Sequence, residues 1–253
     1  MQVFTEQDRE HIRQELVAAA QADSRIRGAA HLGSAVVGRL DQWSDIDLAL
    51  CVAAEADLSD VLVDWTQRMY NDYAAIAKFD VRRCTILYRV FLLNNTLQVD
   101  LSFWRTTEFR ALGPKFSLIF GAAGEPIPVP EPDSMDLIGM AWLHALHVRS
   151  SIARGRLLQA EHMLSGMRDS VLALACRRHG VADVQGRGLD DLPEELKVRA
   201  IDCLAQSLDS IALKRAFRTT TNILIDEIRY FDTTLAAKLM GPLNMVVSCL
   251  DVD

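Results

Sequence analysis

The sequence predicts an α/β (α+β) amino-terminal domain with a short mixed sheet, followed by an all-α helical bundle. Short apolar strands alternate with helical segments in the first half of the chain. Residues 125–133 contain four prolines, which fix φ and lack a backbone donor, so neither a helix nor a ladder continues through them. Beyond the prolines the apolar period becomes helical. We therefore expect a domain over 1–125, a linker over 126–133 and a bundle over 134–253.

Each element of the first part follows from its local pattern. The expected order is a helix over about 5–22, a strand over about 27–33, a short helix from about 34, a strand over about 45–53, a helix over about 58–77, and two strands over about 81–90 and 96–104, with a turn at Asn94 and Asn95.

The second part has helical periodicity throughout. Apolar positions from Leu137 to Ile152 fall near one stripe, and further amphipathic segments cover about 156–179, 193–211 and 212–239. A loop with glycines and acids is expected over about 185–195. This pattern is typical of a helical bundle.

Composition excludes several classes of protein. Half of the residues are apolar, but no apolar run approaches the ~20 residues that a bilayer requires, and the first ten residues do not resemble a secretion signal. These features predict a cytoplasmic protein with no membrane partner. The net charge is -7, which argues against nucleic acid as a partner. Residues 1–133 hold 13 basic and 19 acidic residues, so a phosphate-bearing ligand there would need its charge cancelled.

Asp45 and Asp47 stand one residue apart in an otherwise apolar strand. Side chains at i and i+2 of a strand point to the same face, so the two carboxylates lie side by side. A bridging divalent cation turns this repulsion into attraction, and carboxylates with substrate phosphates are the usual ligands of Mg²⁺ in proteins. The alternative is an exposed strand start with two solvated acids.

Two further features bear on this choice. Gly33 and Ser34 follow an apolar strand end, where a glycine lets the backbone approach a phosphate and a serine can cap a helix. The alternative is an ordinary turn with an N-cap. Asp100 lies on the polar face of a strand that alternates with Leu97, Val99 and Leu101, and a neighbouring strand is only ~5 Å away. Asp100 can therefore complete a carboxylate triad.

The run of Gly33 and Ser34, ten intervening residues, Asp45-Ile46-Asp47 and a later Asp100 resembles the signature of the DNA polymerase β-like nucleotidyltransferase superfamily. More narrowly, it is similar to bacterial antibiotic nucleotidyltransferases, such as the aminoglycoside and lincosamide adenylyltransferases. The motifs cover about residues 26–104, and the two-part layout covers the whole chain.

The resemblance implies a transferase that uses magnesium and a nucleoside triphosphate, with ATP expected. Asp45 and Asp47 would bind Mg²⁺, Gly33 and Ser34 would hold the β- and γ-phosphates, and Ser44 would be an extra donor. Asp100 would complete a second metal site or act as the general base. The product would be an adenylylated hydroxyl on a small molecule such as an aminoglycoside-like antibiotic, which implies a role in antibiotic resistance.

The helical part is expected to supply the acceptor side. Glu161 and Arg168, seven residues apart, share a bearing at the edge of an apolar stripe. They either pair with each other or leave Glu161 to act on the acceptor, so Asp100 and Glu161 are both candidates for the general base. A non-catalytic nucleotide sensor on the same fold is the alternative function, modification of RNA or protein is a third, and a homodimer is left open.

Overall fold

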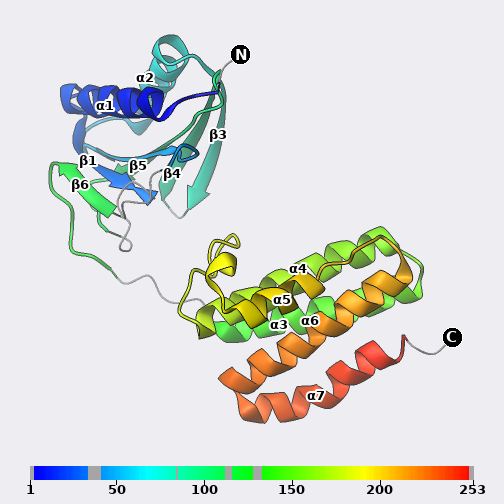
Figure 1. The fold of residues 1–253 in the computed structure, drawn as a ribbon. Coiled ribbons are helices and arrows are strands. Elements are labelled where there is room, and N and C mark those ends of the chain that lie inside the picture. The colour runs from blue at the N-terminus through cyan, green and yellow to red at the C-terminus, as the bar shows by residue number, and fades with distance from the viewer. Residues whose placement is uncertain (1–2, 34–40, 84, 112–115, 128–132, 251–253) are drawn as a thin grey trace. The chain divides into compact units, whose positions relative to one another are not determined.

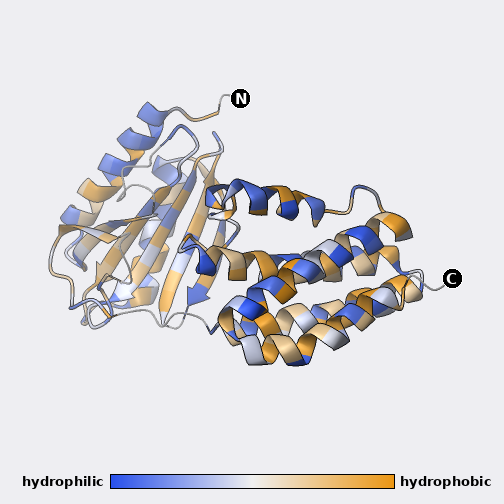
Figure 2. Cartoon of the chain, turned by 60° about the horizontal axis from the view of Figure 1, so that its bottom comes forward, coloured by the Kyte–Doolittle hydropathy of each residue, from blue (hydrophilic) through white to orange (hydrophobic). Residues whose placement is uncertain are grey.

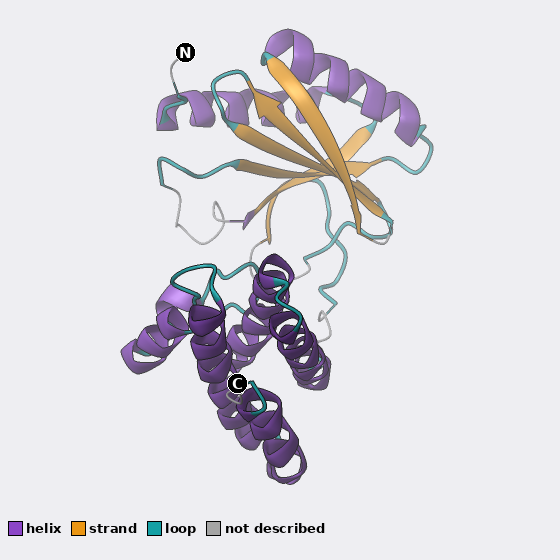
Figure 3. Cartoon of the chain, turned by 90° about the vertical axis from the view of Figure 1, so that its right-hand side faces the viewer, coloured by secondary structure: helices purple, strands orange, loops and turns teal. Residues whose placement is uncertain are grey.

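The computed structural model describes residues 3–33, 41–83, 85–111, 116–127 and 133–250 of the chain. The chain divides into two compact units, Met1–Pro130 and Glu131–Asp253. Among these residues, every strand lies in the first unit, and the second unit is built from helices (Figures 1 and 3). The predicted fold class is confirmed. Most of the linker expected over 126–133 lies outside the described residues.

The first unit is built on a mixed sheet of six described strands in the order β3-β4-β5-β2-β1-β6. β2 and β5 pair in parallel, whereas every other neighbouring pair is antiparallel. The strands are β1 (Ile26–Leu32), β2 (Ile46–Val52), β3 (Ala75–Arg83), β4 (Ile86–Leu93), β5 (Gln98–Arg105) and β6 (Phe116–Phe120), and the helices are α1 (Glu6–Ala22) and α2 (Leu58–Asp72).

The two faces of this sheet differ. Leu48 and Leu101 point to the face covered by α1 and α2, where they share a core with Leu16 of α1 and Trp65 of α2. The alternate positions of β2 and β5 point to the other face. There a smaller cluster closes the carboxyl ends of β2 and β5, and it consists of Ala30, Ala49, Cys51, Ile86, Trp104 and Phe109. The acidic side chains lie on this second face, nearer the amino ends of both strands.

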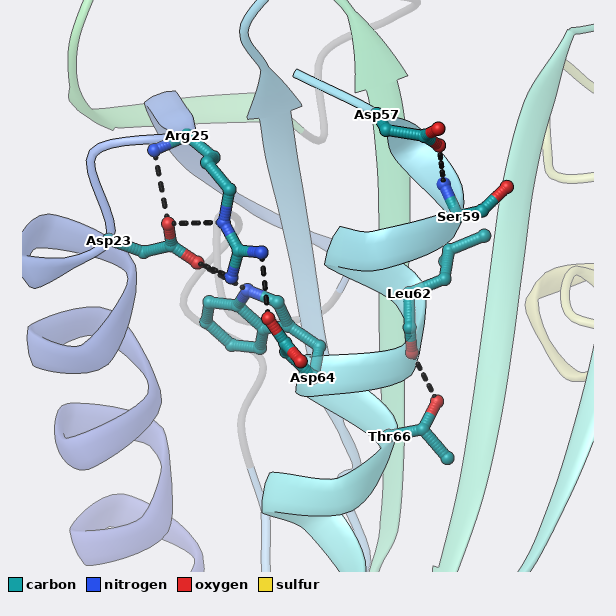
Figure 4. A network of polar contacts seen from close by, with 8 residues as sticks. Asp23, Arg25, Asp57, Ser59, Leu62, Asp64 and Thr66 are labelled. Carbon is teal, nitrogen blue, oxygen red and sulfur yellow. Dashed lines mark hydrogen bonds and ion pairs between the residues drawn. The ribbon is translucent and has the colours of Figure 1, made fainter.

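A polar network fixes α2 beside the start of β1 (Figure 4). The Arg25 guanidinium donates to Asp23 at 2.9 Å and to Asp64 at 2.7 Å. Asp57 caps α2 by accepting the Ser59 backbone N–H at 2.7 Å. Arg25 therefore ties α2 to the residues just before β1, and Asp57 stabilises the first turn of α2.

The second unit packs its longer helices around a large apolar core, and a smaller cluster of Ala175, Cys176, Leu192 and Leu196 lies beside it in the chain. Figure 2 shows apolar and polar residues alternating around these helices, as amphipathic packing requires. The helices are α3 (Ser134–Ala153), α4 (Leu157–Arg178), η2 (Leu189–Asp191), α5 (Glu194–Asp202), α6 (Ser210–Phe231) and α7 (Thr233–Ser248). Within the described residues, no helix is both long and apolar enough to cross a membrane.

Several element boundaries differ from those expected. The helix predicted over 58–77 ends at Asp72, because Ala74 adopts a left-handed φ of 54° and β3 begins at Ala75. The helix predicted over 193–211 ends at Asp202. The helix predicted over 212–239 is interrupted at Asp232, whose extended backbone ends α6 and whose side chain caps α7. The apolar period on either side of these breaks predicts continuous helices, although Asp72, Asp202 and Asp232 have low helix propensity.

Candidate metal centre

Three carboxylates converge where β2 and β5 run side by side. Asp47 and Asp100 are register partners in this parallel pair, and Asp45 immediately precedes β2 on the same face as Asp47. Ligand oxygens of Asp45, Asp47 and Asp100 all lie within 4.8 Å of one another, and each residue is half-buried. The backbone register therefore brings together the three acids that the sequence singled out.

The surroundings of Asp100 disfavour its charged form. Burial is the main reason that the pKa of Asp100 is raised to about 6; a hydrogen bond from Gln98 lowers this pKa, and the neighbouring Asp45 carboxylate raises it. The Gln98 amide nitrogen donates to Asp100 at 2.9 Å and approaches Asp45 at 3.4 Å. In the cation-free protein this cluster thus holds more negative charge than its surroundings favour.

Gly33 lies against the same cluster. Its φ of +68° is left-handed, and a Cβ at this position would overlap the Asp47 Oδ2 atom. A glycine is therefore required here on two grounds, its backbone conformation and the space that the Asp47 carboxylate takes. The residue that follows β1 consequently lies directly beside the Asp47 carboxylate.

The structure describes only one of the two serines that were expected to bind phosphate. Ser34 falls among residues 34–40, outside the described part of the chain. Ser44 belongs to the turn that leads into Asp45. Its hydroxyl donates to the Asp41 carboxylate and accepts the Asp41 backbone N–H, both at 3.0 Å. Ser44 therefore organises this turn, and it would have to exchange the Asp41 bond to donate to a phosphate.

Arg9 of α1 is a residue that the sequence analysis did not single out. It is only 5% exposed, and its guanidinium donates to the backbone carbonyls of Asp41 and Ser44. Its Nε atom is buried with no hydrogen-bond partner among the described residues. A buried cation that binds the turn before Asp45 fixes the entry to β2 and adds positive charge near the acids.

Glu161 lies in the helical unit, on α4. Its side chain is 35% exposed and lies 3.8 Å from the Arg168 guanidinium, which also donates to Ser165 and to the Cys203 carbonyl. One Glu161 carboxylate oxygen is buried without a partner among the described residues. The ion pair considered from the sequence therefore exists, and half of the Glu161 carboxylate stays outside it.

The donor set of the cluster suits a hard divalent cation. Mg²⁺ prefers oxygen ligands and is usually held by one or two carboxylates together with substrate phosphates. Asp45, Asp47 and Asp100 offer carboxylate oxygens close enough to share one or two ions. Asp45, Asp47 and Asp100 are therefore the residues that would hold such a cation.

Comparisons with known proteins reach only distant structures. No protein-family model matches the sequence, and no curated protein matches it. Among solved structures, the chain is similar to an aminoglycoside 6-adenyltransferase from Bacillus subtilis, with 11% identity, coverage of 96% of this chain and 99% of that chain, and a TM-score of 0.41. It is also similar to the CdnE cyclic dinucleotide synthase of Elizabethkingia meningoseptica, with 12% identity, coverage of 90% and 81%, and a TM-score of 0.31.

Terminal uridylyl transferase 4 from Trypanosoma brucei matches at 13% identity, with coverage of 91% of this chain and 69% of that chain and a TM-score of 0.31. The neighbours are thus nucleotidyltransferases of the polymerase β-like kind. At these identities and TM-scores the likeness says nothing about chemistry, which has to come from the residues of the site.

Proposed function

We propose that this chain is a Mg²⁺-dependent nucleotidyltransferase that transfers a nucleoside monophosphate, AMP from ATP, to a hydroxyl of a small molecule. The observation that carries this proposal is the convergence of Asp45, Asp47 and Asp100 from two parallel strands, with ligand oxygens within 4.8 Å of one another. Three acids crowded at one edge cost free energy unless a cation offsets their repulsion.

The chemistry is an in-line displacement at phosphorus. The acceptor hydroxyl oxygen forms a bond to the α-phosphorus, the bond to the bridging oxygen breaks, and pyrophosphate leaves. A bound divalent cation would neutralise the charge that accumulates on the phosphate oxygens. The chain itself supplies mainly positioning, since Asp45 and Asp47 are held by β2 and the turn before them is held by Arg9.

Asp100 is the first candidate for the general base that takes the hydroxyl proton. Burial raises the pKa of Asp100 in the cation-free protein, and a cation bound beside it would lower that pKa again, so the choice of Asp100 rests on its place beside Asp45 and Asp47. Glu161, with one carboxylate oxygen outside its ion pair, is the second candidate and belongs to the helical unit proposed to bind the acceptor. Gly33 and Ser34 are proposed to hold the β- and γ-phosphates, with Ser44 as an extra donor.

An aminoglycoside or lincosamide is the acceptor class that we propose. The acidic balance of residues 1–133, with 13 basic against 19 acidic residues, suits a cationic acceptor. Modification of such a compound would confer antibiotic resistance.

The test is pyrophosphate release from ATP and Mg²⁺ with a panel of aminoglycosides and lincosamides. We expect acceptor-dependent release by the natural chain and at least ~100-fold slower release by Asp47→Asn, which removes a ligand charge and keeps the side-chain shape. The matched control is Asp60→Asn, which neutralises an exposed acid on α2 and should leave the rate unchanged.

The outcomes separate the candidate functions. Cation-dependent ATP binding without release for any acceptor would favour the nucleotide sensor. Equal rates in Asp47→Asn and the natural chain would remove the carboxylate cluster from the reaction altogether.

A further inference from the structure

The Gln98 side chain occupies the space between two of the three acids. In the parallel register, Ile46 pairs with Val99 and Asp47 with Asp100, which sets Gln98 of β5 beside Asp45. The Gln98 amide nitrogen lies 2.9 Å from Asp100 Oδ1 and 3.4 Å from Asp45 Oδ2. A single neutral donor group thus faces two carboxylates.

An amide NH₂ group supplies two N–H donors, whereas ionised carboxylates only accept. In the cation-free cluster, the Gln98 amide donates toward one oxygen of Asp45 and one oxygen of Asp100. Without the amide, these two like-charged carboxylates would face each other with no donor between them. A hydrogen bond donated to the ionised carboxylate stabilises it, and the 2.9 Å bond to Asp100 does so here. The amide thus partly substitutes for a cation, without carrying its charge.

A divalent cation shared by these acids needs the same lone pairs. An ion that bridges Asp45 and Asp100 has to take Asp100 Oδ1 or Asp45 Oδ2 from the amide, or to crowd the amide out. Each hydrogen bond that is given up subtracts from the binding free energy of the ion. The amide and the cation are consequently alternatives at this position.

We propose that Gln98 is a positioning residue that holds Asp45 and Asp100 in the cation-free protein and competes with the divalent cation for them. This inference deepens the proposed function and rests on it in one respect, namely that the acids bind a divalent cation. Gln98 thereby lowers the affinity of the three acids for the cation. A lower affinity allows a cation that arrives with a nucleotide to be released again in each cycle.

The sign of the effect of removing the amide follows directly. Without it, Asp45 and Asp100 lose a donor in the cation-free state and lose nothing in the cation-bound state. The affinity for the ion therefore rises. If the amide instead rotated to present its oxygen as a ligand, the affinity would fall on removal. The two roles predict opposite changes.

The experiment is a titration of the full chain with Mn²⁺, in which free Mn²⁺ is followed by electron paramagnetic resonance in the absence of nucleotide. We expect Gln98→Ala to bind Mn²⁺ about three- to tenfold more tightly than the natural chain, since hydrogen bonds to charged groups are given up on binding. Gln98→Thr, which suits a strand and is too short to reach the acids, should behave alike. Gln67→Ala removes an exposed glutamine on α2 and should have no effect.

A gain in affinity is a result that damage to the fold does not produce. Unchanged or weaker Mn²⁺ binding in both Gln98 variants would overturn the inference and leave the metal centre standing. Loss of Mn²⁺ binding in Asp47→Asn identifies the site. Absence of binding in the natural chain would overturn the metal centre itself, together with the role of Gln98.

Discussion

Glu227 in the helical unit and Asp100 in the sheet unit are both at least half-buried carboxylates, but the charges around them have opposite signs. The Glu227 side chain is 1% exposed, and both its oxygens accept from the Arg178 guanidinium at 2.8 Å. Asp100 accepts from a neutral amide and lies against Asp45 and Asp47. Glu227 is thus matched with an opposite charge, whereas Asp100 belongs to a cluster of like charges. The contrast is between these two sites, since the sheet unit also holds a matched pair, Arg89 with Asp80 at 2.6 Å.

This difference indicates that the acids of the candidate metal centre lower the stability of the cation-free fold. A bidentate pair between a guanidinium and a carboxylate satisfies both groups when they are desolvated. A cluster of carboxylates does not satisfy itself, so it persists only because the surrounding sheet fixes its backbone. The comparison therefore predicts that neutralising Glu227 and neutralising Asp100 have opposite consequences for stability.

The largest expected effect on stability is that of Glu227→Gln. An amide in place of the carboxylate leaves the Arg178 guanidinium without its counter-charge, and this should lower the free energy of unfolding by about 2–3 kcal/mol, somewhat less than for a fully buried pair because Arg178 is 27% exposed. Urea unfolding measures this loss.

The matched control is Asp226→Asn, because Asp226 is exposed and pairs with Arg199 and Arg229 at the surface. We expect it to lower the free energy of unfolding by less than ~1 kcal/mol. Equal losses in Glu227→Gln and Asp226→Asn would mean that burial of the pair does not matter.

An intermediate effect is expected on the acid side of the pH range, and it concerns His31. The Nε2 atom of His31 lies 2.8 Å from Arg13 Nη1, which can only donate, so the ring is neutral in the folded chain. Burial, with a further contribution from Arg13, lowers the pKa of His31 below its ordinary value.

The unfolded chain therefore binds more protons than the folded chain once the pH falls below ~6.5, and stability should fall with it, by at most about 1.4 kcal/mol per pH unit. His31→Gln keeps an acceptor for Arg13 and removes the titration. Unfolding curves at pH 5 and pH 7 should differ less for the variant than for the natural chain, and an identical difference in both would exclude His31 as the source.

The smallest expected effect, and the most diagnostic in sign, is that of Asp100→Asn in the cation-free protein. A raised pKa means that the folded state disfavours the charged carboxylate, so a neutral side chain at pH 7.5 should leave stability unchanged or raise it by up to about 1 kcal/mol. Urea unfolding with a chelator present measures this. A loss as large as that of Glu227→Gln would remove the distinction between the two units.

Local pattern was sufficient to predict that Asp45, Asp47 and Asp100 share polar strand faces, because a period of two needs only the residues themselves. It was not sufficient to predict that β2 and β5 are parallel neighbours, since 45 residues separate their ends. Strand β3 was missed because only Ala75 in it is buried and charged side chains occupy much of the rest, so it lacks the apolar face of a typical strand.

Gln98 and Arg9 illustrate two further limits. Gln98 stands two residues before Asp100, so alternation places it on the acidic face, but a neutral amide shows no crowding of charge and was passed over. Arg9 acts on backbone carbonyls more than 30 positions away, a contact that no spacing within α1 indicates.

The parallel pairing of β2 with β5 also determines at which stage of folding the three acids can come together. β3, β4 and β5 form consecutive hairpins, whose contacts are local and close quickly. Asp47 and Asp100, by contrast, are 53 positions apart (100 − 47) and meet only when the hairpins dock on β2, a long-range closure of the kind that slows folding. During synthesis, β2 leaves the ribosome before β5, so the edge of β2 that pairs with β5 has no partner until β5 has been made. The carboxylate cluster is therefore a late product of folding, and a chain that has acquired it has already assembled its central sheet.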